Sequence, residues 1–251
     1  MAIDSHMHIN SLVLNDMQKY IDKVNNNLKI DSVINVGMNI ETSKEAINIS
    51  DTNDKFYSTI GIHPLYLKGE NVYSLYNLSN NDKVVAIGEI GFDDKFNNYE
   101  EQKLYLILQI RIANELKLPV VIHSSNSNIK IIDIFERYVR PEYGCVFHCF
   151  QPDIQVLEYL VNHGIYISFA GRITYKNASR SIEVIKTVPN NLFLVETDSP
   201  FISPEPFRDK INTSDNLKHI IEKISQVKNI SYNDVEEITC ENTRKLFKRI
   251  R

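Results

Sequence analysis

The feature that most constrains the fold of this 251-residue chain is a repeat of short apolar runs separated by segments with helical periodicity. Eight such runs are predicted as strands, with last residues near His8, Met38, His63, Glu89, His123, His148, Ala170 and Asp198. Successive ends are 22 to 34 residues apart, which leaves room for one strand and one helix. Eight units of this length favour an α/β fold with a single TIM-like (β/α)8 barrel. An open doubly wound sheet stays the alternative.

No linker or change of composition divides the chain, so residues 1–251 are predicted to form one domain. The content of 43% apolar and 24% charged residues is typical of a globular protein with a sizeable core. Apolar residues at helical spacing over residues 14–27 predict the first helix.

The net charge of −4 argues against an extended basic surface that coats nucleic acid, while a local basic groove stays possible. No apolar run approaches the roughly eighteen residues needed to span a bilayer. The first residues lead into a predicted strand without the pattern of a signal peptide. We therefore expect a cytoplasmic protein with no membrane partner and no obligate protein partner.

The three cysteines are too few for a disulfide framework. Cys145 and Cys149 would share one face of a strand, with His148 on the opposite face. They are interpreted as small core residues beneath the helices rather than as metal ligands.

The first predicted strand carries two alternating histidines, in Asp4-Ser5-His6-Met7-His8. Asp4, His6 and His8 would share one face, because successive side chains of a strand point to opposite faces. Such a pair supplies two imidazole nitrogens, which are common ligands of Zn²⁺. Taken alone, the pair also fits two structural histidines.

Polar residues end four further strands, and parallel strand ends meet at one rim of a barrel. Strict alternation predicts that Val85, Ile87 and Glu89 share a face directed into the barrel. Together the rim would carry four histidines and two carboxylates: His6, His8, Glu89, His123, His148 and Asp198. This is more than one tetrahedral ion needs, so two divalent ions are predicted, with Glu89 able to bridge them.

These residues lie in stretches that resemble the TatD family of metal-dependent hydrolases, in the amidohydrolase superfamily. The matching stretches cover nearly the whole chain: residues 4–8, 61–64, 86–93, 119–123, 146–150, 194–200, 206–208, 212 and 241–243. The Gly-Glu-Ile-Gly and Glu-Thr-Asp-Ser-Pro stretches are specific in combination.

The resemblance implies a barrel with two divalent metal ions. Three residues would bind the first ion, two residues would bind the second, and Glu89 would bind both. The implied ligands are His6, His8 and Asp198 for the first ion and His123 and His148 for the second. It also implies phosphodiester hydrolysis, usually by a deoxyribonuclease with exonuclease character, here expected to run 3′–5′. Some relatives are proposed to edit D-aminoacyl-tRNA.

Metal-assisted hydrolysis fits both the residues and the resemblance. Asp198 and Glu89 are the predicted catalytic carboxylates, with Asp198 accepting a proton from water. His63 and Arg208 are candidate contacts to the substrate, although a turn histidine and a solvated arginine explain them equally well. Glu196 shares a face with Asp198 and is a candidate for orienting a ligand. Zn²⁺, Mn²⁺ and Fe²⁺ suit this ligand mixture, and Mg²⁺ less so.

Three positions depart from the family pattern. Ser125, in Ser124-Ser125-Asn126, stands where an arginine is expected; Gln151-Pro152 replaces a Ser-Gly pair; and Asn10 replaces an acid. The predicted metal ligands are intact, so the changes concern the surroundings of the substrate. Loss of an arginine removes a bidentate phosphate clamp.

Three function classes follow. The first is a nuclease that acts on single-stranded DNA or DNA ends. The second is a hydrolase of another ester, such as D-aminoacyl-tRNA or a small phosphoester. The third is a non-catalytic barrel kept for interaction, which would have little reason to retain six metal ligands.

Overall fold

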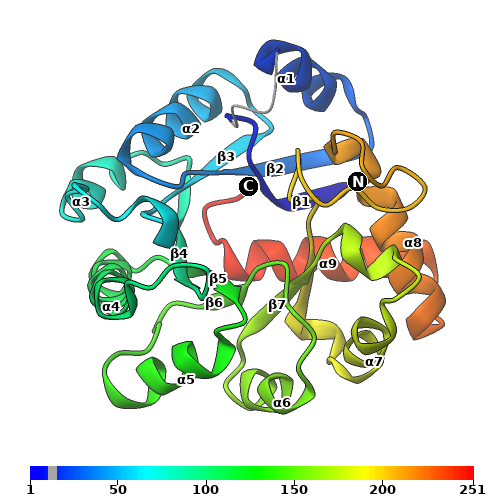
Figure 1. Ribbon diagram of the computed structural model, residues 1–251. Coiled ribbons are helices and arrows are strands. Elements are labelled where there is room, and N and C mark those ends of the chain that lie inside the picture. The colour runs from blue at the N-terminus through cyan, green and yellow to red at the C-terminus, as the bar shows by residue number, and fades with distance from the viewer. Residues whose placement is uncertain (11–15) are drawn as a thin grey trace.

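The computed structural model describes residues 1–10 and 16–251, in which eight parallel strands are surrounded by helices (Figure 1). The strands are β1 (Ala2–Met7), β2 (Ile30–Val36), β3 (Phe56–Ile60), β4 (Val84–Asp93), β5 (Val120–Ser125), β6 (Cys145–Phe147), β7 (Tyr166–Phe169) and β8 (Phe193–Val195). The α-helices are α1 (Met17–Asn26), α2 (Ile40–Thr52), α3 (Ser74–Leu78), α4 (Tyr99–Leu116), α5 (Asn128–Arg137), α6 (Ile154–Asn162), α7 (Ser179–Thr187), α8 (Leu217–Lys228) and α9 (Tyr232–Leu246). Short 3-10 helices are η1 (Pro64–Tyr66), η2 (Gly171–Thr174), η3 (Asn190–Leu192) and η4 (Ser214–Asn216). Of the predicted helix over residues 14–27, positions 14 and 15 lie outside the described residues.

The strands pair in sequence order from β1 to β8, each parallel to the next. The first and last strands also meet, because Met7 forms a parallel bridge with Ser199. Beside this bridge the Asp198 amide donates to the His6 carbonyl at 2.9 Å, and the His8 amide donates to the Ser199 carbonyl at 2.7 Å. The predicted TIM-like barrel is therefore confirmed over an open sheet.

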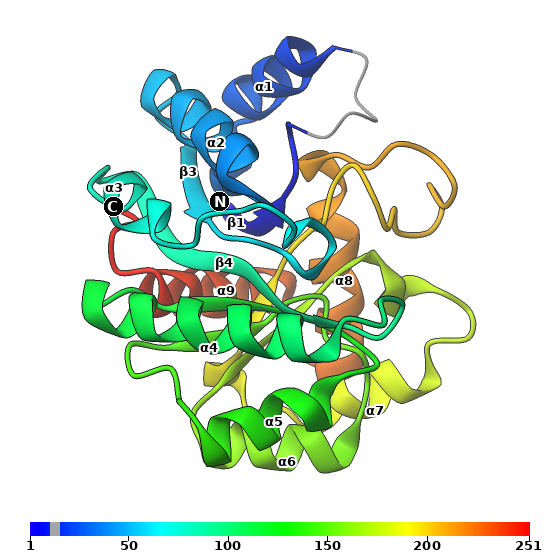
Figure 2. The same cartoon turned by 60° about the vertical axis from the view of Figure 1, so that its left-hand side comes forward.

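Apolar residues form two layers, one between strands and helices and one inside the barrel. The inner layer includes Ile3, Val121 and Leu194 from the strands, packed with Leu246 and Phe247 at the end of α9. Figure 2 shows α9 toward the end of the barrel where the strands begin, while the loops after β7 and β8 extend from the opposite end. One end of the barrel is thus filled by apolar side chains, which leaves the carboxyl ends of the strands for polar residues.

Strand β4 is longer than predicted and does not alternate strictly. It continues past Glu89 to Asp93, and its pairing with β5 shifts between Ile87 and Ile90. Val85 packs in the inner layer and Ile87 in the outer one. The prediction that Val85, Ile87 and Glu89 share a face is therefore wrong, because the register shift turns Glu89 into the barrel after Ile87 has faced outward.

The two glycines beside Glu89 are required by close backbone packing. A Cβ on Gly88 would lie 2.6 Å from Cβ of Val121, and a Cβ on Gly91 would lie 1.9 Å from the carbonyl oxygen of His123. Gly91 also has φ of +151°, a conformation that side chains disfavour. These contacts bring β4 and β5 together where Glu89 and His123 must meet.

Strand β1 also departs from alternation, with a register shift between Asp4 and Met7. The Asp4 carboxylate accepts hydrogen bonds from the Thr197 amide at 2.8 Å and the Ser214 hydroxyl at 2.7 Å, and that same hydroxyl contacts the Met7 sulfur. Asp4 and Met7 thus face η4, outside the barrel. The prediction that Asp4 shares a face with His6 and His8 is wrong, and Asp4 instead ties β1 to the segment after β8.

The prediction for the two cysteines is half correct. Cys145 is buried in the outer core layer, as expected. Strand β6 ends at Phe147, however, and Cys149 follows with φ of +43° and is partly exposed. Its side chain therefore belongs to the loops at the carboxyl end of the barrel. No helix in the described part of the chain has the length and apolar character to cross a membrane.

Candidate metal centre

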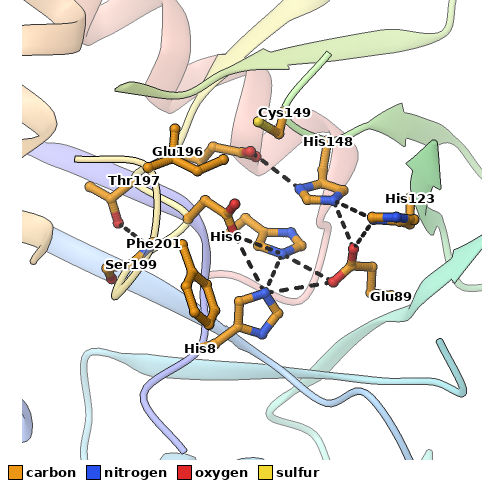
Figure 3. A network of polar contacts seen from close by, with 12 residues as sticks. His6, His8, Glu89, His123, His148, Cys149, Glu196, Thr197, Ser199 and Phe201 are labelled. Carbon is orange, nitrogen blue, oxygen red and sulfur yellow. Dashed lines mark hydrogen bonds and ion pairs between the residues drawn. The ribbon is translucent and has the colours of Figure 1, made fainter. Parts of the chain in front are cut away.

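The structure brings the six predicted donor residues together at the carboxyl ends of the strands, from segments that span most of the chain (Figure 3). Glu89 from β4 lies between two sets of histidines, with one carboxylate oxygen toward each set. We call His6, His8 and Asp198, with Glu89 Oε2, the first donor group. His123 and His148, with Glu89 Oε1, form the second donor group.

In the first donor group, the donor atoms of His6, His8 and either carboxylate have spacings close to those of a tetrahedral ligand set. Four ligands at about 2.0–2.2 Å from one ion lie about 3.3–3.6 Å from each other. His6 Nε2 and His8 Nε2 are 3.1 Å apart, and lie 3.5 Å and 3.6 Å from Glu89 Oε2. Asp198 Oδ1 lies 3.8 Å from His6 Nε2 and 3.4 Å from His8 Nε2. These residues therefore fit a small divalent cation.

The second donor group is more contracted. Glu89 Oε1 lies 2.6 Å from His123 Nδ1 and 2.8 Å from His148 Nε2, and these two nitrogens are 3.4 Å apart. The two short contacts are hydrogen-bond distances, at which a proton joins nitrogen to carboxylate. The same atoms can ligate a cation if the histidines give up those protons.

Each histidine of the second donor group has a carboxylate behind it. His148 Nδ1 lies 3.3 Å from Glu196 Oε1, and Glu196 also accepts a short hydrogen bond from Ser168 of β7. His123 Nε2 lies 3.4 Å from Asp93 Oδ2. A carboxylate in this position fixes the ring and leaves the other nitrogen free to ligate. Glu196 thus lies where the sequence interpretation placed it.

The histidines of the first donor group differ in this respect. Within the described residues, Nδ1 of His6 and Nδ1 of His8 are buried and have no hydrogen-bond partner. Their rings instead contact other rings. The His6 ring stacks on the His148 ring with centres 4.0 Å apart, and the centre of the His8 ring lies 6.1 Å from that of Phe201.

His63 lies beside the second donor group, with Nε2 3.6 Å from Glu89 Oε1, but its hydrogen bonding sets it apart from the ligands. Its Nδ1 accepts a hydrogen bond from the Leu65 amide at 3.1 Å, so Nδ1 carries no proton. The proton of the neutral ring therefore lies on Nε2, which makes that nitrogen a donor and not a metal ligand. Burial lowers the pKa of His63 to about 3, which keeps the ring neutral.

Electrostatics in the centre follow from burial and neighbouring charge. Burial would lower the pKa of His148, but the negative charges of Glu89 and Glu196 raise it well above its ordinary value. Burial and the charge of His148 lower the pKa of His6. Burial would raise the pKa of Glu89, but the nearby histidines, His148 foremost, hold it well below its usual range. Protonated histidines and a divalent cation would each neutralise the same buried negative charge. Binding of a cation would therefore displace protons from the histidines.

Arg208, a predicted substrate contact, lies apart from these residues. It is exposed, in the long loop after β8, and its guanidinium lies 4.5 Å from the centre of the Tyr175 ring. In the residues that the structure describes it makes no ion pair with either donor group. Its role stays a prediction.

Three residues of the site had no role in the sequence interpretation: Asp93, Ser168 and Phe201. Asp93 could have been found, because Glu89, Gly91 and Asp93 alternate along β4 once the strand is extended. The hydrogen bond with His123 lowers the pKa of Asp93 to about 2. Ser168 and Phe201 gave no local signal, since only tertiary contacts bring them to Glu196 and His8.

Comparison with known proteins gives the same picture over the full length. The chain is 32% identical to the uncharacterized metal-dependent hydrolase YabD of Bacillus subtilis over 254 residues, covering 99% of both chains. It is 35% identical to an uncharacterized metal-dependent hydrolase of Buchnera aphidicola, covering 98% of this chain and 95% of that one.

Among solved structures, the chain is similar to the TatD homologue YjjV of Escherichia coli, with 26% identity, a TM-score of 0.87 and coverage of 98% of both chains. A TatD family hydrolase of Entamoeba histolytica has the same fold, at 20% identity and a TM-score of 0.83, covering 98% of this chain and 97% of that one. The profile of the family described as TatD related DNase matches residues 3–248, and the chain therefore belongs to the TatD family.

Proposed function

We propose that this protein is a hydrolase that uses two divalent metal ions to cleave phosphodiester bonds of DNA, as a 3′–5′ exonuclease. The observation that carries the proposal is the position of Glu89, whose two carboxylate oxygens face two separate donor groups. A bridging carboxylate between two histidine-rich groups suits a pair of ions that act on one ester.

The donor residues fit such ions by chemistry and by spacing. Imidazole and carboxylate ligands suit Zn²⁺ or Mn²⁺, and Mg²⁺ is the third candidate. Bound there, the ions would supply the Lewis acidity that makes water a nucleophile near neutral pH and neutralises charge on the phosphoryl oxygens.

Asp198 is the proposed proton acceptor. Oδ1 faces His6 and His8, and Oδ2 has no hydrogen bond within the described residues, so it can take a proton from water. Hydrogen bonding and charge from His8 hold the pKa of Asp198 below its usual value against the effect of burial, so the carboxylate is ionised. The backbone hydrogen bond from Asp198 to His6 fixes its position at the barrel closure.

His63 is the proposed donor to the substrate. The ring is neutral with its proton on Nε2, so it can donate a hydrogen bond to a phosphoryl or leaving-group oxygen without competing for a cation. Its buried position beside Glu89 places this donor at the centre.

Two exposed aromatic rings support a substrate with bases. Phe201 is 42% exposed and lies beside His8, while Tyr66 is 39% exposed and lies beside His63, with ring centres 6.4 Å apart. Unpaired bases stack on such rings, which favours single strands or ends over an intact duplex.

The test combines metal content with digestion. Elemental analysis of the purified protein should find bound divalent metal, and a 5′-labelled single-stranded DNA should be shortened stepwise from its 3′ end. A chelator should stop the shortening, and added Zn²⁺, Mn²⁺ or Mg²⁺ should restore it. Metal without any cleavage of DNA would contradict the proposal.

A second candidate function is hydrolysis of another ester, such as D-aminoacyl-tRNA or a small phosphoester. The altered loops favour it, because Ser125 stands where the family resemblance places an arginine. Turnover of a small ester or of D-aminoacyl-tRNA, without shortening of DNA in the same preparation, would select this candidate.

A further inference from the structure

A small hollow lies next to the second donor group, and we call it the Arg172 hollow. It is lined by the last residue of β7, by residues that follow β6 and β7, and by Ser181 of α7. The residues used here are Cys149, Gln151, Pro152, Phe169, Arg172 and Ser181. Cys149 directly follows His148, so the hollow opens beside the metal centre and not on a remote face.

The two loops that depart from the family pattern near the substrate meet at the Arg172 hollow. Gln151 and Pro152 form part of its wall. The Gln151 side-chain oxygen accepts a hydrogen bond from the Asn126 amide at 3.3 Å, which ties this wall to the altered Ser124-Ser125-Asn126 loop. The changes therefore meet at one place, on the same side of the metal centre.

Arg172 is the charged residue of this wall. It lies in η2, directly after Gly171, and is exposed. A Cβ on Gly171 would lie 2.0 Å from the carbonyl oxygen of Ile202, so the turn packs directly on the segment after β8 and the start of η2 is fixed. Within the described residues the Arg172 guanidinium has no ion pair, which leaves its donors available to a ligand.

Arg172 lies near a second arginine and near Asp209, in a chain of net charge −4. Arg172 and Arg208 both lie near Tyr175, where their positive charges oppose the rise of its pKa caused by burial. Tyr175 is itself held by a hydrogen bond to the Ser203 carbonyl at 2.9 Å, and Arg208 stacks on its ring. The rim after β7 and β8 thus presents two guanidinium groups near Tyr175.

We propose that Arg172 binds the phosphate next to the scissile one in the substrate strand, and so replaces the arginine that is missing at Ser125. This inference rests on the proposed nuclease function. The neighbouring phosphate is assigned because Arg172 contacts neither donor group, while Cys149 of the same hollow adjoins His148. A guanidinium offers the paired donors that a phosphate prefers.

The assignment separates substrates with one phosphate from those with several. An oligonucleotide has a phosphate next to the scissile bond, whereas methyl p-nitrophenyl phosphate has only the ester that is cleaved. Arg172 should therefore matter for the first substrate and not for the second.

The experiment compares Arg172→Gln and Arg172→Lys with the wild-type protein and with Arg137→Gln. Arg137 is a control because it is an exposed arginine at the end of α5 whose one ion pair among the described residues is with Asp133, one turn away. Each protein is assayed for hydrolysis of a single-stranded oligonucleotide and of methyl p-nitrophenyl phosphate. Binding of a fluorescein-labelled oligonucleotide is measured by anisotropy with a chelator present, over a range of salt concentrations.

We expect Arg172→Gln to weaken oligonucleotide binding and raise KM about tenfold, with kcat nearly unchanged. Arg172→Lys should lose about two- to threefold, because the charge remains but the paired donors do not. The slope of log K against log salt should fall by about 0.7 for the loss of one phosphate contact to a single strand. Hydrolysis of methyl p-nitrophenyl phosphate and all properties of Arg137→Gln should stay within about twofold of wild type.

An unchanged KM and salt slope in Arg172→Gln would overturn the inference while DNA cleavage by the wild type upholds the proposed function. Equal losses on both substrates would also overturn it, because they would indicate a structural role. If the wild type cleaves only methyl p-nitrophenyl phosphate, the nuclease function fails and the inference fails with it.

Discussion

The two donor groups share Glu89 but differ in what lies behind their histidines. In the second donor group, Glu196 and Asp93 stand behind His148 and His123. In the first, Nδ1 of His6 and Nδ1 of His8 have no partner among the described residues. A carboxylate behind a histidine raises its basicity as a ligand and fixes its orientation. The histidines of the two donor groups should therefore differ in their basicity as ligands.

The spacing of the donor atoms differs in the opposite sense. The first donor group is already open enough for an ion, with contacts of 3.1 to 3.8 Å, whereas the second is drawn together by two short hydrogen bonds to Glu89. An ion entering the second group must displace protons, and its affinity should therefore fall more steeply at low pH. The comparison suggests that geometry favours entry into the first group, while ligand basicity favours retention in the second.

The largest effect is expected from His148→Ala, which removes a predicted ligand of the second group and the ring on which His6 stacks. Hydrolysis should fall by at least about a thousandfold, because the charge stabilisation of one ion is lost. The measurement is turnover together with metal content and thermal unfolding, with the exposed residue change His163→Ala as control. Wild-type turnover in His148→Ala would refute a role for two ions.

A smaller loss is expected from His63→Gln, because it removes a hydrogen-bond donor and no ligand. The turnover number should fall about a hundredfold, which is the usual effect of losing one such donor. Metal content should stay at the wild-type value, and this distinguishes His63 from the histidines of both groups. A parallel loss of metal would mean that His63 is itself a ligand.

The carboxylates behind the second group provide a direct test of the difference between the two donor groups. Glu196→Gln should weaken the binding of one ion about 10- to 100-fold and leave the other unchanged. Asp93→Asn should have an effect near the lower end of this range, because Asp93 is 6% exposed and Glu196 only 1%. Calorimetric titration with Zn²⁺ or Mn²⁺ measures both, and the exposed change Glu183→Gln on α7 is the control. If the affinity for both ions fell equally, the proposed difference between the two donor groups would be wrong.

The smallest expected effect is the difference in affinity between the two ions, measured by removing metal. A graded chelator should withdraw the two ions in two steps, with affinities that differ by about tenfold, and the first group should empty first. In Glu196→Gln the two steps should merge or exchange order. Residual metal after dialysis, followed at each chelator concentration, is the readout, and a single step in the wild type would contradict the proposed inequality.

Much of the site follows from local sequence. His6 and His8 two residues apart, with Glu89, His123, His148 and Asp198 near other strand ends, needed only the rule that parallel strands share a rim. Errors arose where strands do not alternate. Asp4 and Ile87 were placed on the wrong faces because register shifts in β1 and β4 depend on the neighbouring strands.

The sequence by itself predicted the barrel and the family, which are confirmed, and the set of candidate donor side chains, because strand and helix periodicity and ligand chemistry are local properties of the chain. The tertiary structure decided how those side chains are distributed between the two donor groups and which residues support them. Only long-range contacts give His148 its partner Glu196, bring His63 beside Glu89, and place Arg172 next to the altered loops. Such contacts join residues far apart in sequence, and their hydrogen bonds leave no periodic trace along the chain.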